Sequence, residues 1–351
     1  MQITYFIGNG FDINLGLKTT YQDFYEYIFI TKPDEIKDNV IYRAIKDKIK
    51  DWSDFEVALG LMTKESVFFE KIFYASLTEF RKDFKKYLIL QLGEIADEDE
   101  LIMDNFCTSF LDELTTNQLN KALNRLNKNM RQEEKKTFTF DTLTFNYTPT
   151  IDNYIKKFKG SMSIKDMSRY FEKHDPSLSL SLQDKFEINH PIHLHDTLEN
   201  GMFLGVDNEE QINVDRLSID LKDQLIKPLS TSLHNDIMKE NALSIIKRTD
   251  LFIIFGCSFG ETDKSWYSEV VSRLNFNNNV FCIIHVFNPN VDIYEDFYEK
   301  EARYKEYKQT FVNHYDPNLD SISKDNIFRS IFIIENTVTL FNRTTKDTVY
   351  A

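Results

Sequence analysis

The residues best suited to chemistry include a cluster of histidines. Three of the seven histidines lie within six residues, in "HPIHLH" (190–195). On a strand, His193 and His195 would share one face and His190 would not. Alternate histidines can chelate a metal, yet the spacing fixes no third ligand. We therefore favour His195 as a general base, because an unperturbed imidazole titrates near pH ~6.5. His193 then takes a structural or ribose-contacting role.

A second candidate is Asn146, which follows the apolar run "TFTFDTLTF" (137–145). This position corresponds to the carboxyl end of a strand, where open α/β sheets bind ligands. A carboxamide there can hold a water molecule or a ribose hydroxyl. The alternative is an Asx-turn that ends the strand, which the nearby Pro149 makes plausible.

The opening "ITYFIGNGFD" places two of only 10 glycines around one asparagine, directly after an apolar run. A strand that ends in glycines and leads into a helix is the layout of a phosphate-binding turn. A tight turn without a ligand is the alternative. We expect Gly8, Asn9, Gly10, Phe11 and Asp12 to contact a ligand, with a helix N-cap as the other role for Asp12.

The segment "DLFIIFGCSFGETD" (250–263) repeats this order of strand, glycine, polar residues and helix. Gly256, Ser258 and Asp263 are the candidates for ligand contact here, with a helix cap as the alternative for Asp263. Cys257 is most simply a small buried hydrophobe.

Two charged residues outside these turns are weaker candidates. Glu56 lies on an expected helix and is more often a solvated surface acid than part of a pocket. Lys227 precedes Pro228 and could reach a phosphate, although an isolated lysine is usually solvated.

Apolar runs and helical periodicity predict the elements that position these residues. Buried strands are expected at 3–7, 137–145, 191–195, 251–255 and 280–286, a short strand at 202–206, and edge strands at 330–335 and 337–341. Helical spacing of apolar residues dominates from Thr20 to about Met130. These patterns predict an α/β fold with a mainly parallel sheet of Rossmann type and a large helical insertion after the first βα unit. We divide the chain into an α/β nucleotide-binding domain (1–30 and 136–351) and the insertion (31–135).

The chain lacks the ordinary dehydrogenase fingerprint. Position 13 is Ile where a third glycine would stand, and the segment after Tyr21 is helical, so it offers no second strand with an acid at its end.

The composition limits the classes of function. The net charge of −14 over 351 residues argues against general nucleic-acid binding. Three cysteines without a CxxC pair fit a reducing cytoplasm and exclude a zinc ribbon. The sequence contains no run of about 18 apolar residues, the length that a membrane span needs, and its N-terminus does not resemble a signal peptide. We expect a cytoplasmic protein without membrane contact.

Four blocks together resemble the AbiH family of bacteriophage abortive-infection proteins: "IGNGFDINLGLKTTYQDF", "TFNYTPT", "IHLHD" with "FLGV", and "FGCSFGETD". "WSDFEVALG" (52–60) is a weaker fifth block. The same blocks also resemble a diverged sirtuin-like NAD-binding domain.

The sirtuin-like resemblance implies roles for several residues. Gly8 and Gly10 match its first turn, Asn146 its strand-end Asn, His195 its His, and Gly256 and Ser258 its late turn. Asp196 departs from that pattern, because glycine usually follows the His. Asp tolerates a left-handed backbone better than most residues, so the turn can survive.

These resemblances imply an antiphage protein that binds NAD+ and hydrolyses its nicotinamide–ribose bond. In that reaction Asn146 orients water or ribose, His195 acts as base, and the phosphates lie over Gly8–Gly10. One alternative is a non-catalytic sensor of NAD or an ADP-ribose-type signal that acts through a partner. Another is a metal-dependent hydrolase or nuclease that uses the 190–195 histidines. The expected partner is a small nucleotide. The phage-derived trigger is unknown, and a homo-oligomer is one option for the assembly.

Overall fold

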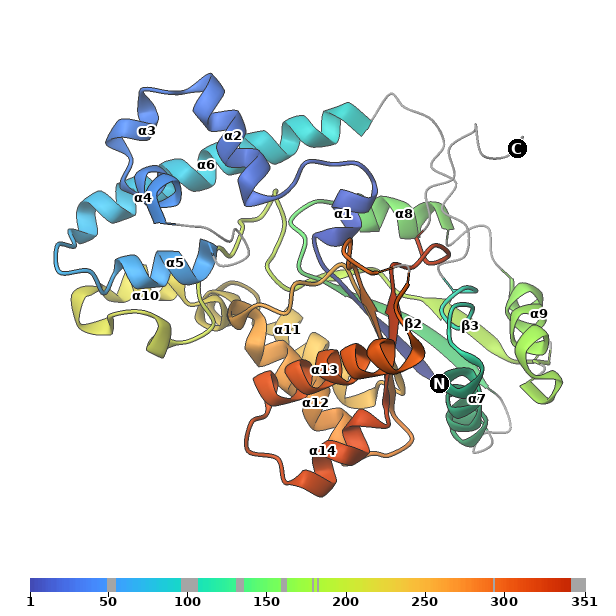
Figure 1. Cartoon of the computed structure of the whole chain (residues 1–351). Helices are drawn as coiled ribbons and strands as arrows, with labels where there is room; N and C mark the ends of the chain where they lie inside the picture. Colours follow the sequence, from blue (N-terminus) through green and yellow to red (C-terminus); the bar gives the residue numbers. More distant parts are fainter. Residues whose placement is uncertain are drawn as a thin grey trace.

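The computed structural model describes residues 1–48, 55–95, 107–130, 136–158, 163–178, 180–181, 183–292 and 294–341. At their centre is a parallel sheet of seven strands (Figure 1). Six of them lie in the order β3-β2-β1-β5-β6-β7. The seventh, β4, pairs with the last residues of β2, whereas β3 pairs with the first residues of β2. The strands are β1 (Gln2–Ile7), β2 (Thr137–Thr144), β3 (Lys185–Ile188), β4 (Ile192–His193), β5 (Leu251–Phe255), β6 (Phe281–Val286) and β7 (Ile331–Glu335). The prediction of one mainly parallel sheet is confirmed.

The strand order reverses direction at β1. From β1 the chain builds outward through β2 and β3 on one side, then returns to place β5, β6 and β7 on the other. Parallel α/β sheets bind ligands at the carboxyl ends of strands beside such a reversal. The topology therefore singles out the edge above β1 and β5.

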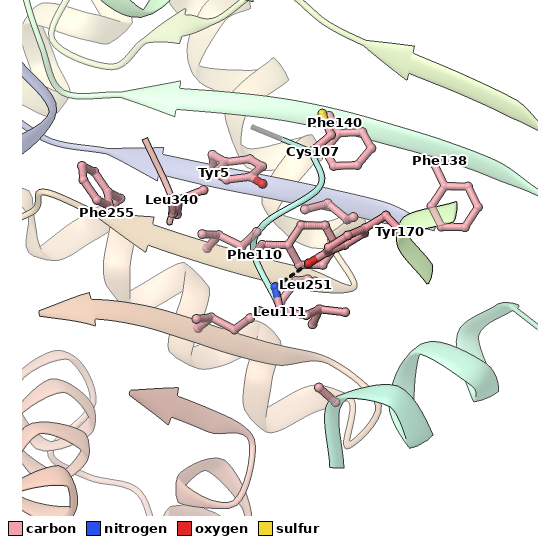
Figure 2. Packing of buried hydrophobic residues seen from close by; sticks show 14 of the residues in the cluster. Tyr5, Cys107, Phe110, Leu111, Phe138, Phe140, Tyr170, Leu251, Phe255 and Leu340 are labelled. Carbon is pink, nitrogen blue, oxygen red and sulfur yellow. Dashed lines mark hydrogen bonds between the residues drawn. The ribbon is translucent and has the colours of Figure 1, made fainter. Parts of the chain in front are cut away.

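Helices cover both faces of the sheet, as the continuous apolar strands require. One face packs against α7 (Thr116–Met130), α8 (Thr150–Phe158) and α9 (Ile164–His174). Figure 2 shows this core, in which the Tyr170 hydroxyl accepts a 2.7 Å hydrogen bond from the Leu111 N–H. The other face packs against α11 (Lys227–Arg248), α12 (Lys264–Phe276), α13 (Phe297–Tyr315) and α14 (Ser321–Phe328).

A helical insertion between β1 and β2 has a core of its own. Within it lie α2 (Tyr21–Thr31), α3 (Glu35–Asp38), α4 (Val40–Lys48), α5 (Phe55–Met62) and α6 (Glu70–Ile95), after the short α1 (Gly10–Asn14). Their apolar side chains share one cluster with residues from 198–226, which include α10 (Ile219–Leu225). Figure 1 shows α10 beside α5. The insertion helices and residues 198–226 therefore form one packed unit, here called the helical lobe.

Several sequence predictions need correction. Residues 202–206 form only an isolated bridge between Val206 and Ile226, and 337–341 form no strand. The strand expected at 191–195 is limited to Ile192–His193, and β3 was not predicted. Residues 52–54 of the "WSDFEVALG" block and 131–135 of the predicted insertion lie outside the described residues. No described helix combines the length and apolarity needed to cross a membrane.

Candidate functional site

The two glycine turns pack directly against each other at the ends of β1 and β5. A Cβ on Gly8 would lie 2.4 Å from the Gly256 carbonyl oxygen, and one on Gly256 would lie 2.7 Å from the Phe11 nitrogen. Gly256 also has a φ of +68°, in the left-handed region that favours glycine. Close contact between the two backbones therefore accounts for these glycines.

The same contact uses donors that an anion would need. The N–H of Gly8 donates to the Phe255 carbonyl, that of Gly10 to the Gly256 carbonyl, and that of Phe11 to the Gly8 carbonyl. The two turns are thus one hydrogen-bonded platform under the carboxyl edge of the sheet. These three N–H groups are therefore not free to bind a phosphate, and they do not support the phosphate-binding prediction for Gly8–Gly10.

Asp12 is the hub of a buried hydrogen-bond network. Its carboxylate accepts hydrogen bonds from Thr148 Oγ1 at 2.5 Å, Thr150 Oγ1 at 2.5 Å and Asn146 Nδ2 at 3.2 Å. Burial raises the pKa of Asp12, and the three donors offset part of that rise. The N-cap of α1 is Asn9, so Asp12 does not have the capping role. It joins α1 to the end of β2 instead.

This hub fixes the orientation of Asn146. Because Asn146 Nδ2 donates to a carboxylate, Oδ1 is the free end of the amide. Asn146 is 4 % exposed, and its Oδ1 has no hydrogen-bond partner among the described residues. Buried polar atoms are normally paired, so this oxygen is available to accept a hydrogen bond from a water molecule or a ligand.

His193 lies behind the site. Its Nδ1 lies 2.7 Å from the Asn146 carbonyl oxygen and its Nε2 lies 2.8 Å from Asp152 Oδ2. Burial lowers the pKa of His193, but the Asp152 carboxylate outweighs it and raises the value above normal. Both nitrogens face acceptors, which suits an imidazolium that braces the backbone of Asn146. His193 is therefore placed as a supporting residue and does not contact the cavity described below.

His195 belongs to a buried charge cluster. Its Nε2 lies 2.9 Å from Asp263 Oδ1, which also contacts Lys227 Nζ at 2.9 Å. Lys227 Nζ in turn lies 2.6 Å from Glu56 Oε2. Nε2 cannot both donate to Asp263 and accept from Lys227, which is 3.5 Å away. The shorter contact indicates Nε2–H donating to Asp263, which leaves the lone pair on Nδ1.

Asp263 and Lys227 favour their charged forms despite their burial. Burial raises the pKa of Asp263, but Lys227 and His195 outweigh it and hold the value well below normal. Burial lowers the pKa of Lys227, but Asp263 and Glu56 outweigh it and raise the value. Asp263 stands at the N-cap position of α12 without a capping side-chain bond. Its carboxylate serves His195 and Lys227.

A cavity of about 1280 Å³ joins these groups along the carboxyl edge of the sheet. It brings together residues that are far apart in the sequence and that strand-end positions predict. They are Gly8, Asn9, Gly10, Asp12, Asn146, His195, Gly256, Ser258 and Asp263. Phe11 is not among the lining residues. It is fully buried in the core, where its ring lies 5.1 Å from that of Phe341.

The three histidines of 190–195 do not converge. His190 is exposed, His193 contacts Asp152, and His195 contacts Asp263. Within the described residues, no group of three or more His, Cys, Asp or Glu side chains is arranged to hold a metal ion. The geometry gives the metal alternative no support. Asp196 has a φ of +61°, so Asp does take the left-handed position after the His.

Sequence reasoning ranked two site residues too low. Glu56 was expected on the surface, yet it is 8 % exposed, lines the cavity and pairs with Lys227. Lys227 was expected in solvent and is 4 % exposed. Their burial depends on the helical lobe packing over them, which local periodicity does not reveal. The roles of Thr148 and Thr150 have a weak local signal, because polar residues follow the strand in "NYTPT".

Fold and site together define a parallel α/β protein with a cavity at the reversal of its strand order. The chain belongs to the bacteriophage abortive infection AbiH family, whose model matches residues 4–285. A search of curated proteins finds no match. The family match includes β1, the insertion and the strands up to β6, and with them Asn146, His195 and Asp263.

Proposed function

We propose that this AbiH-family protein acts in antiphage defence by binding NAD+ and hydrolysing its nicotinamide–ribose bond. The observation that carries the proposal is one cavity lined by both Asn146, with its unpartnered Oδ1, and His195, held through Nε2 by Asp263. Loss of NAD+ would stop metabolism in an infected cell, which suits abortive infection.

The size and position of the cavity suit a dinucleotide. Pockets for drug-sized ligands occupy roughly 300–1,000 Å³, and this cavity is larger at about 1280 Å³. It runs along the carboxyl edge beside the strand-order reversal, the usual place for nucleotides in such sheets. Its lining residues extend from the ends of β1 and β5 to Ile284, His285 and Val286 of β6.

The reaction needs one water molecule and no redox partner. Water attacks C1′ of the nicotinamide ribose, the C1′–N bond breaks, and nicotinamide leaves with the bonding electron pair. The products are nicotinamide, ADP-ribose and one proton. The transition state resembles an oxocarbenium ion, so a polar atom fixed beside the ribose stabilises it without reorganisation.

Two side chains have distinct tasks in this scheme. Asn146 Oδ1, fixed by Asp12, accepts a hydrogen bond from the water or from a ribose hydroxyl. His195, whose Nε2–H is held by Asp263, accepts the water's proton at Nδ1. The ring of His195 lies 5.2 Å from that of Phe145 and 6.2 Å from that of Tyr147, so aromatic packing limits its rotation.

The two residues can be tested together in cells. Asn146→Ala and His195→Ala should each abolish protection in a phage-plating assay and prevent NAD+ loss during infection. Each supplies one element of a single step, so the rate should fall by ~10²–10⁴-fold.

His190→Ala is the matched control, because that histidine is exposed and should retain protection. Full protection by His195→Ala would contradict the assignment of the base. Protection by the unaltered protein with NAD+ bound but never cleaved would favour the sensor alternative.

A further inference from the structure

The charge cluster behind His195 joins three parts of the chain that are distant in the sequence. Glu56 comes from α5 of the helical lobe, Lys227 is the first residue of α11, and Asp263 precedes α12. Thr262 Oγ1 also donates to Glu56 Oε2 at 2.8 Å. The cluster meets the proposed chemistry at His195, whose Nε2 lies 2.9 Å from Asp263 Oδ1 and 3.5 Å from Lys227 Nζ.

Lys227 does not line the cavity. Lys227 is 4 % exposed and lies behind Glu56, Asp263 and His195, which do line the cavity. A ligand in the cavity therefore meets the carboxylates and the imidazole, while the lysine acts on them from behind. This placement suits a residue that sets the charge and position of others.

We propose that Lys227, clamped by Glu56, is a positioning residue that fixes the Asp263–His195 pair, so that the site is complete only when α5 is docked. The inference rests on the proposed role of His195. It makes the helical lobe part of the site through one ion pair, and it offers a route by which a trigger that moves α5 could change activity.

The docking of α5 is close. A Cβ on Gly60 of α5 would lie 2.5 Å from the Gln211 carbonyl oxygen. Thr63 Oγ1, just after α5, accepts a 2.8 Å hydrogen bond from the Asn213 N–H. Because Gly60 allows this approach, a methyl group there would push α5, and with it Glu56, away from Lys227.

Electrostatics predicts that loss of the Lys227 charge and loss of the Glu56 charge shift the titration midpoint of His195 in opposite directions. Loss of the Lys227 charge removes a cation 3.5 Å from His195 Nε2, which favours the imidazolium. Loss of the Glu56 charge leaves the Lys227 charge less neutralised, which disfavours the imidazolium. The other titratable groups that interact with Glu56 or Asp263 are Tyr21, Tyr147, Arg81, Cys257, Tyr267 and Tyr315, and none of them is replaced in these variants.

The test is an NMR titration of His195 in the free full-length protein, with the resonance assigned by its absence in His195→Ala. Lys227→Met should move the titration midpoint up by about 1 pH unit or more, and Glu56→Gln should move it down. Lys264→Met removes a charge from the residue next to Asp263 and should leave the midpoint nearly unchanged. Lys227→Arg should preserve it.

Three further variants guard the test against misfolding of Lys227→Met and test the docking of α5. If Lys227→Met does not fold, Glu56→Gln/Lys227→Met removes the clamp without leaving two carboxylates unpaired, and its midpoint should lie above that of Glu56→Gln alone. Gly60→Ala should shift the midpoint in the direction of Glu56→Gln. Gly93→Ala on α6, where no atom lies within 4 Å of the added Cβ, should not.

The proposal would be overturned if Lys227→Met and Glu56→Gln shifted the His195 midpoint in the same direction, or if neither variant shifted it. An unmoved midpoint in Gly60→Ala would overturn its docking part. These outcomes are independent of NAD+. Predicted shifts without nicotinamide release in the presence of phage lysate would refute the proposed function alone, whereas release with an unmoved midpoint would refute the clamp alone.

Discussion

Asp12 and Asp263 are two buried carboxylates whose surroundings give them different tasks. Asp12 faces neutral donors, so burial prevails and raises its pKa. Asp263 faces Lys227 and His195, so attraction prevails and lowers its pKa. Asp12 therefore organises hydrogen bonds around Asn146, and Asp263 organises charge around His195. The same residue type serves both sides of one cavity.

Removal of the Asp12 carboxylate should destabilise the fold and release Asn146. Asp12→Ala leaves three buried donors without their acceptor, so the free energy of unfolding should fall by about 3 kcal/mol. Thr148→Val removes one donor only and should cost about 1 kcal/mol. Urea denaturation measures both. Equal losses in the two variants would contradict the role of Asp12 as a hub.

His285 should make the folding stability depend on pH in the acidic range. Neither ring nitrogen of His285 has a hydrogen-bond partner among the described residues, and burial lowers its pKa to about 4. Between pH ~6.5 and 4 the unfolded chain binds a proton that the folded chain does not. Stability should therefore fall as the pH falls through this window, by on the order of 3 kcal/mol in total.

His285→Leu should remove that part of the pH dependence. Denaturation of the variant and the unaltered protein at pH 7 and pH 4.5 measures the difference. If both lose the same stability on acidification, His285 is not the group responsible.

At the scale of single residues, the sequence predicted some of the site residues and missed others. Asn146 and His195 follow short apolar segments, and strand ends share one edge of a parallel sheet, so their meeting in one cavity was predictable. Glu56 and Lys227 have no such signal, because their burial depends on the contact of the helical lobe with α11. Phe11 was misplaced because the turn directs its side chain into the core.

At the scale of elements, the two glycine turns act as one unit. Their backbones are hydrogen-bonded from Gly8 to Phe255 and from Gly10 to Gly256. The pattern of strand, glycine and helix correctly located both turns. It did not reveal that each turn is the other's main contact, because that depends on the pairing of β1 with β5.

Gly256→Ala should therefore damage the platform. The added Cβ would lie 2.7 Å from the Phe11 nitrogen at a φ of +68°, so we expect a loss of about 3 kcal/mol or more and of NAD+ binding. Gly260→Ala is the matched control four residues later, where the nearest atom is 3.7 Å from the Cβ. Chemical denaturation compares the two, and equal stabilities would refute the platform.

The strands that were mispredicted have identifiable causes. Residues 202–206 pair with 225–227 through Val206, whose N–H donates to the Leu225 carbonyl and whose carbonyl accepts from the Lys227 N–H, and this pairing makes only a bridge. Around 337–341, Glu113 accepts hydrogen bonds from the Val338 and Thr339 N–H groups, which holds a turn in place of an edge strand. In β3 the charged residues Lys185 and Glu187 obscured the strand pattern.

At the scale of the whole molecule, the cavity lies where the sheet meets the helical lobe. Helix α7 packs on the sheet, although its sequence follows the other insertion helices, and residues 198–226 pack with the lobe. Apolar periodicity predicted the helices but not their partners, so the proposed domain limits at 31 and 135 stay a prediction. The lobe supplies Glu56, Tyr21 and Phe84 to the cavity wall.

Release of nicotinamide from NAD+ by the purified full-length protein, with and without phage lysate, tests the central claim most directly. We expect the unaltered protein to release nicotinamide and ADP-ribose in equal amounts once triggered, and Asn146→Ala and His195→Ala to be slower by ~10²–10⁴-fold. His190→Ala should match the unaltered protein. Intact NAD+ after incubation of a phage-protective preparation with lysate would contradict the proposed hydrolysis.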